Sequence, residues 1–135
     1  MTRIWERLYI GSLADAEALA DNNPRSISTV VSLSEIPVEN KSRDINYLQL
    51  SIEDDEQVSA RQFDAIMDGL YENIRWGRVL LNSGQGISLA PSLAAAYMDA
   101  VGYKNVDAAL KEIRQIRPFI HPSTTLLNSL KEHLK

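Results

Sequence analysis

Residues 79–93 read VLLNSGQGISLAPSL, a short apolar run that passes through a glycine turn into a helical pattern. The run stops at Asn82, and Gly84 and Gly86 permit the tight backbone path of a turn into a helix. Such a turn at the carboxyl end of a strand gathers backbone N–H groups near the positive end of the helix dipole. The segment therefore predicts a strand, an anion-binding turn and a helix. The alternative is a plain glycine-rich connection in which Ser88 only caps the helix.

The rest of the chain alternates between β-branched apolar runs and helical periodicity, which predicts one α/β domain over residues 1–135. Strands are predicted at 4–10 (one strand or a pair), 27–33, 46–52 and 78–82. Helices are predicted from Ser12 to about Ala20, from Ser59 to Gly77, from Ser88 to Val101, over 106–116 and over 126–134. This order favours a central sheet of four or five mostly parallel strands with helices on both faces. Strand 78–82 is expected inside the sheet, and the helix from Ser88 is expected to be buried.

Composition removes several classes of function. The chain has 135 residues, a net charge of −4 and no cysteine, which excludes disulfides, thiolate metal sites and thiol catalysis. It has no basic cluster and no long apolar segment, so neither nucleic acid nor a membrane is expected as a partner. Its two histidines, His121 and His133, are too far apart for a local metal-binding pair, and no metal or other cofactor is expected. Because no signal-peptide pattern occurs, the chain is predicted to be cytoplasmic.

Known motifs can be compared with the turn. It lacks the lysine of the P-loop and the third glycine of G-x-G-x-x-G. Residues 86–90 come close to the G-x-S-x-G nucleophile elbow, with Ser88 as the nucleophile. Asp99 or Asp107 and then His121 follow in the chain order of such a triad. A serine hydrolase that uses Ser88 is therefore a weaker alternative.

A further comparison covers nearly the whole chain. Its segments, specific in their order and spacing, are Leu8–Ser12 (LYIGS), Ile52–Asp55 (IEDD), Gly86–Ser88 (GIS), Ala90–Ser92 (APS), Ala108–Leu110, Ile113–Arg114, Arg117–Pro118 and His121–Ser123. On these residues the chain resembles the small dual-specificity protein phosphatases of the cysteine-dependent tyrosine phosphatase superfamily. The signature there is a strand, H-C-x5-R followed by Ser or Thr, and a central helix. The resemblance implies the fold predicted above and a loop that binds a phosphoprotein or another phosphate-bearing ligand.

The chain departs from this signature where the family carries out its chemistry. Asn82 stands at the histidine position, Ser83 at the nucleophilic cysteine, Leu89 at the phosphate-gripping arginine and Ala90 at the hydroxyl residue after it. The resemblance also implies that Asp54 occupies the general-acid position, although the adjacent Asp55 fits as well. It assigns phosphate binding to Ser83, Gly84, Gln85, Gly86, Ile87, Ser88 and Leu89.

These replacements predict a loss of catalysis. A serine hydroxyl is far less acidic than a thiol, and no general base is evident beside Ser83. Leu89 cannot stabilise phosphoryl charge in the transition state, a loss that commonly costs a factor of about one hundred or more in rate. We therefore expect a phosphatase domain that is inactive or severely impaired and keeps a phosphate-binding loop. The second interpretation is an engineered or inactivated variant of an active phosphatase, although one Cys-to-Ser change would not explain Leu89, Ala90 and Asn82.

Overall fold

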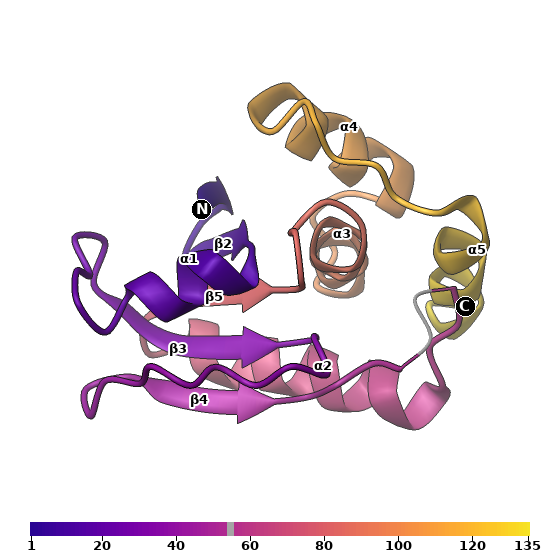
Figure 1. The fold of residues 1–135 in the computed structure, drawn as a ribbon. Coiled ribbons are helices and arrows are strands. Elements are labelled where there is room, and N and C mark those ends of the chain that lie inside the picture. The colour runs from indigo at the N-terminus through magenta and orange to yellow at the C-terminus, as the bar shows by residue number, and fades with distance from the viewer. Residues whose placement is uncertain (54–55) are drawn as a thin grey trace.

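The computed structural model describes residues 1–53 and 56–135, within which five strands form one sheet in the order β1-β2-β5-β3-β4. The strands are β1 (Thr2–Trp5), β2 (Leu8–Gly11), β3 (Ile27–Ser32), β4 (Asn46–Gln49) and β5 (Arg78–Asn82). β1 and β2 pair antiparallel, and the other neighbours pair parallel. β5 lies in the middle of the sheet between β2 and β3, which confirms the prediction for 78–82 (Figure 1).

Five helices cover the two faces of the sheet in the described part of the chain. They are α1 (Leu13–Ala18), α2 (Ala60–Ile74), α3 (Leu89–Ala100), α4 (Val106–Ile116) and α5 (Thr124–His133). α1 packs on one face, and α2 to α5 contribute to the core on the other. The first two helices end slightly earlier than predicted, at Ala18 and Ile74. None of the described helices is long and apolar enough to cross a membrane.

Each face of the sheet has its own core, because side chains alternate along a strand. On the α1 side, Leu80 of β5 packs with Val30 and Ala16. On the opposite side, Val79 and Leu81 belong to the larger core beneath α2 to α5. All five side chains are fully buried. β5 is therefore fixed from both faces, and so is the point at which its backbone leaves the sheet.

α3 is the central helix of the larger layer. Figure 1 shows it end-on, between the sheet and the helices α4 and α5. Every residue from Ala90 to Met98 is buried, which confirms the predicted burial. Small side chains such as Ala95 allow this close packing, since they leave little volume between neighbouring backbones. The sheet and its covering helices therefore fix the N-terminal end of α3.

The strand predicted over 46–52 is shorter than expected. β4 ends at Gln49, although the N–H groups of Leu50 and Ile52 still donate to the carbonyls of Ser32 and Leu33, at 2.9 and 3.0 Å. The apolar pattern predicted that this segment would run beside β3, which it does. It did not reveal where the regular pairing of the strand stops.

Candidate functional site

The turn between β5 and α3 is the feature predicted to bind phosphate. It lies at the carboxyl end of the central strand, where ligands usually bind in open α/β sheets. A depression of about 260 Å³ is lined by seven consecutive residues, here called the 83–89 loop: Ser83, Gly84, Gln85, Gly86, Ile87, Ser88 and Leu89. The structure thus brings the predicted loop residues together around one depression.

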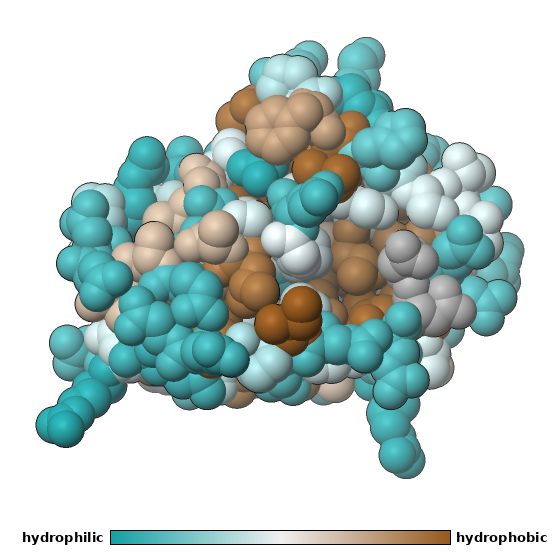
Figure 2. Space-filling view, in the orientation of Figure 1, coloured by the Kyte–Doolittle hydropathy of each residue, from teal (hydrophilic) through white to brown (hydrophobic). Residues whose placement is uncertain are grey.

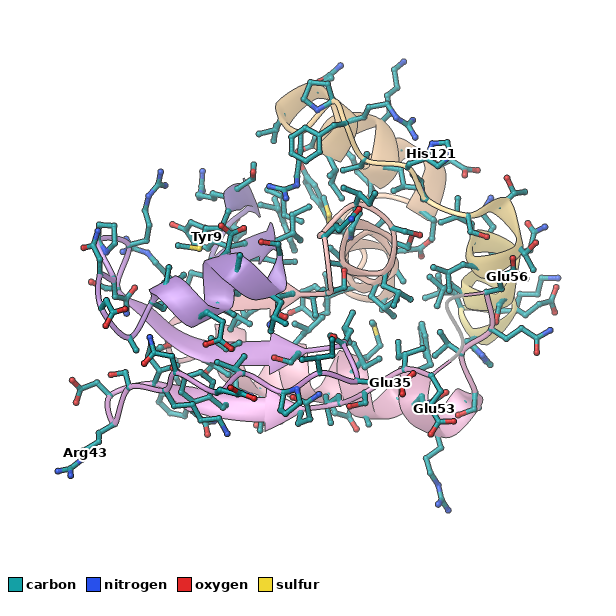
Figure 3. All side chains as sticks on the ribbon, in the orientation of Figure 1. Tyr9, Glu35, Arg43, Glu53, Glu56 and His121 are labelled. Carbon is teal, nitrogen blue, oxygen red and sulfur yellow. The ribbon has the colours of Figure 1, made fainter. Side chains whose placement is uncertain are left out.

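Two backbone hydrogen bonds fix the carbonyl groups of the loop to other segments. The N–H of Leu13 donates to the carbonyl of Gly84 at 2.9 Å, and the N–H of His121 donates to the carbonyl of Ile87 at 2.6 Å. His121 belongs to the connection between α4 and α5, above α3 in Figure 3, so this connection holds the loop through its backbone. Within the described residues, the N–H groups of 84–89 have no acceptor. Since backbone donors require partners, these N–H groups are available to a ligand or to water.

Gly86 is the loop glycine that the conformation requires. Its φ is +70°, in the left-handed region that favours glycine. A Cβ at this position would lie 2.6 Å from the carbonyl carbon and oxygen of Gly11. A Cβ at Gly84 would meet no atom within 4 Å. Of the two glycines that the sequence singled out, only Gly86 is sterically constrained.

Ser83, and not Ser88, supplies the side chain that caps α3. Ser88 is the N-cap residue by position, but its side chain makes no capping hydrogen bond. The Oγ of Ser83 accepts the N–H of Ala90 at 3.1 Å, and the hydroxyl group is buried. The backbone N–H of Ser83 donates to the carbonyl of Gly11 at 3.3 Å. The Ser88 side chain therefore does not cap the helix as that alternative supposed, and the Ser83 hydroxyl lies at the positive end of α3.

Asn82 joins the ends of two parallel strands beneath the loop. It is fully buried and is the register partner of Ser32. Its Nδ2 donates to the Oγ of Ser32 at 2.8 Å and to the carbonyl of Val31 at 3.4 Å. Its Oδ1 has no partner among the described residues. These contacts give Asn82 a structural role between β5 and β3.

Arg117 lies behind the loop, a position that its place in the sequence did not indicate. It is 6% exposed, and its Nη1 donates to the Oγ1 of Thr2 at 2.7 Å. A Cβ built on Gly86 would lie 3.1 Å from its Nη2. Burial lowers the pKa of Arg117, whereas the negative charge of Asp15 opposes that shift. No local pattern could have predicted this contact, because Arg117 and Thr2 are 115 residues apart.

Known proteins are similar to this chain in both sequence and architecture. A probable dual specificity protein phosphatase of Dictyostelium discoideum is 30% identical over 124 residues, which cover 91% of this chain and 58% of that protein. The crystal structure of DUSP15 is similar with a TM-score of 0.86 and 26% identity, and the match covers 99% of this chain and 86% of that one. The chain is thus similar to dual-specificity protein phosphatases in both its sequence and its fold.

A third similarity concerns the fold alone. A mouse putative dual specificity phosphatase complexed with zinc tungstate has a TM-score of 0.86 and 18% identity, with coverage of 98% of this chain and 84% of that one. No family model matches the chain. The chain spans less than two thirds of the length of the Dictyostelium relative. The predicted fold and the resemblance are therefore confirmed, while the roles of Ser83, Asp54 and Leu89 stay predictions.

The 83–89 loop has no charged side chain around its depression. None of the seven lining residues is ionisable at neutral pH. Leu89, at the arginine position of the family, is partly exposed and packs against the larger core. Figure 2 shows hydrophobic residues near the centre of the face turned toward the viewer, with hydrophilic residues around its edge. Any attraction of the loop for an anion must therefore come from backbone groups, the α3 dipole and charges outside the lining.

The proposed general acid of the family reaction falls outside the described part of the chain. Asp54 and Asp55 are the residues that the structure does not describe. Glu53 and Glu56, which flank them in sequence, are labelled in Figure 3 and lie on the side of the molecule near α5. Both Asp54 and Asp55 therefore remain candidates for the general-acid position, as the sequence predicted.

The serine-hydrolase alternative requires Ser88, His121 and an aspartate in one cluster. Ser88 precedes α3, and Asp99 lies near its far end, about 16 Å along the helix axis. Asp107 lies in the first turn of α4, and its carboxylate pairs with Lys131 at 2.9 Å. The structure thus brings the backbone of His121 to the 83–89 loop but places neither Asp99 nor Asp107 beside Ser88.

Proposed function

We propose that this chain is a dual-specificity phosphatase domain that binds a phosphate group without hydrolysing its ester. The observation that carries the proposal is the pair Ser83 and Leu89, which stand where the family uses a cysteine and an arginine. The fold around these positions is similar to that of DUSP15, so the change affects the reacting groups and leaves the scaffold in place. The proposed ligand is a phosphoprotein or another molecule that carries a phosphate group.

Turnover fails in this proposal for two chemical reasons. The Ser83 hydroxyl must lose a proton before it can attack phosphorus, and no side chain lining the depression can accept that proton. Its oxygen is already an acceptor for the N–H of Ala90. Leu89 leaves the phosphoryl oxygens without the bidentate guanidinium that would stabilise the charge of the transition state. Asp54, as the general acid, would then have no leaving group to protonate.

Binding survives because it depends on groups that the replacements do not remove. The N–H groups of 84–89 have no acceptor among the described residues, and they surround the N-terminal end of a buried helix. Ground-state binding of an anion needs donors directed at it, whereas catalysis needs interactions that strengthen in the transition state. The fold neighbour that was solved with zinc tungstate suggests a probe, since tungstate is a tetrahedral oxyanion like phosphate.

An altered form of an active enzyme is the second candidate. It predicts the same inactivity for the chain as written, but it requires that both Ser83 and Leu89 replace catalytic residues of a parent sequence. The structural role of Asn82 favours the first candidate, because this buried amide makes specific contacts with Ser32 and Val31. A histidine at the same position would have to find other partners.

The test combines an activity assay with a binding measurement on the unmodified chain. We expect no measurable phosphate release from p-nitrophenyl phosphate, together with tungstate and phosphate binding by calorimetry. Turnover that disappears in Ser88→Ala but persists in Ser83→Ala would contradict the proposal and support the serine hydrolase. Turnover that disappears in Ser83→Ala would show that the hydroxyl is an active nucleophile. A folded chain that binds neither anion would also refute the proposal.

A further inference from the structure

Arg117 is a buried cation for which the fold alone gives no sufficient reason. It follows α4 as the C-cap residue and is 6% exposed. The ring of Phe119 covers it, with the guanidinium carbon 4.5 Å from the ring centroid. Its Nε has no hydrogen-bond partner among the described residues, and its Nη1 has the hydroxyl of Thr2. A buried charge with neutral or missing partners is unfavourable, so its presence calls for a function.

The guanidinium lies against the backbone of the 83–89 loop. A Cβ on Gly86 would approach Nη2 to 3.1 Å, and the bare glycine leaves room for this contact. The loop backbone therefore separates Arg117 from the depression, and the side chain is not among the residues that line it. Arg117 can influence a bound anion through its charge without touching it.

The charge of Arg117 is only partly balanced. Asp15 acts on it from α1, but the Asp15 carboxylate already accepts the N–H of Ser12 at 2.9 Å. The contacts that hold Arg117 in place, with Thr2 and Phe119, are to uncharged groups. In a buried setting such a charge is screened much less than on the surface. It therefore raises the electrostatic potential at the loop, in the same direction as the positive end of α3.

We propose that Arg117 is an electrostatic positioning residue for the anion-binding loop, supplying from behind the backbone the positive charge that Leu89 does not supply from the front. This inference rests on the proposed phosphate-binding function. It specifies the ligand class as a tetrahedral dianion recognised by charge and backbone donors, without a bidentate side-chain contact. Dianions should bind more tightly than monoanions of similar size, because attraction by a fixed charge grows with the charge of the ligand.

The decisive comparison uses Arg117→Met and a matched control on α4, the helix that Arg117 follows. Arg114→Met removes the same charge from an exposed arginine of α4, so both variants have the same net charge. Tungstate affinity should fall about tenfold or more in Arg117→Met, which is the size of effect that a nearby opposite charge has on carboxylate ionisation. Arg114→Met should stay within about twofold, since exposed charges are screened by salt. Arg117→Lys should recover most of the loss, because it restores the charge without the shape of the guanidinium.

The outcomes separate this inference from the proposed function. If the unmodified chain fails to bind tungstate, the proposed function falls and this inference falls with it. If the unmodified chain binds and folded Arg117→Met binds equally well, only the inference is refuted. If Arg117→Lys binds as weakly as Arg117→Met, the role is one of shape and the electrostatic inference is also refuted.

A surface variant covers the case in which Arg117→Met does not fold. Phe119 is 61% exposed, so Phe119→Ala removes the cover of the guanidinium with little effect on the core. Water then reaches the charge and screens it. We expect tungstate affinity to fall by about threefold and to become more sensitive to salt. Unchanged affinity and unchanged salt dependence in Phe119→Ala would refute the inference.

Discussion

Gly86 is the residue on which the shape of the loop depends most directly. Its φ of +70° and the 2.6 Å approach of a Cβ to the Gly11 carbonyl leave no room for a side chain. Gly86→Ala should lower the free energy of unfolding by at least about 1–2 kcal/mol, from the left-handed backbone alone. Urea denaturation measures this loss. The same variant should weaken tungstate binding, because relief of the clash moves the loop away from Gly11 and from Arg117.

Gly84 provides the control for this prediction. It is exposed, and a Cβ there would meet nothing within 4 Å. Gly84→Ala should therefore change the free energy of unfolding by less than about 0.5 kcal/mol. Equal destabilisation by the two substitutions would contradict a special constraint at Gly86, because the reduced conformational freedom of the unfolded chain favours alanine equally at both positions.

α3 carries the loop, and its burial can be tested within one helix. Ala95 is fully buried, so Ala95→Leu inserts volume into a packed layer and should cost about 1–3 kcal/mol of stability. Ala100, at the exposed end of the same helix, makes Ala100→Leu the matched control with an expected change below about 0.5 kcal/mol. Thermal or urea denaturation distinguishes them. Tolerance of leucine at Ala95 would contradict the close packing of α3.

Helices and strands with strong local patterns were predictable from the sequence, but the residues at which they end were predicted less accurately. The period change after Ser59, the apolar run before Asn82 and the buried pattern from Ser88 each correspond to an observed helix or strand. The end of β4 was missed, because pairing with β3 becomes irregular after Gln49 without a change in hydrophobicity. The capping role of Ser83 was missed for a similar reason. It depends on how the turn folds back on α3, whereas the sequence pattern favoured Ser88.

At the scale of the whole molecule, the sequence predicted the layers but not the contacts that cross them. The contact of Arg117 with Thr2, and its approach to Gly86, join the C-terminal end of α4 to the first strand and the central turn. Local periodicity contains no information on such contacts. The family resemblance, in contrast, was carried by segments along the whole chain, and the sheet order and the relatives confirm it. The backbone path of the candidate site was therefore predictable from the sequence, whereas the positive charge that Arg117 places beside it was not.

The scaffold as a whole predicts that catalysis can be restored by two substitutions. Leu89→Arg alone should tighten tungstate binding through a charge-assisted pair and leave turnover absent, since Ser83 remains a poor nucleophile. Adding Ser83→Cys puts a thiol at the N-terminal end of α3, where thiol pKa values are lowered and a thiolate forms near neutral pH. The double variant should form a covalent phosphoenzyme and release p-nitrophenol, with Asp54 protonating the leaving group.

Phosphate release and mass spectrometry of the acid-quenched enzyme measure the two steps of this reaction. Asp54→Asn in the double variant should slow p-nitrophenol release little, because p-nitrophenolate is a good leaving group that needs little protonation. It should slow the hydrolysis of phosphotyrosine more, since that leaving group is more basic. A double variant that binds tungstate tightly but forms no phosphoenzyme would contradict the prediction. Asn82 and Ala90 would then be the replacements that keep the loop inactive, because they are the remaining departures from the family signature.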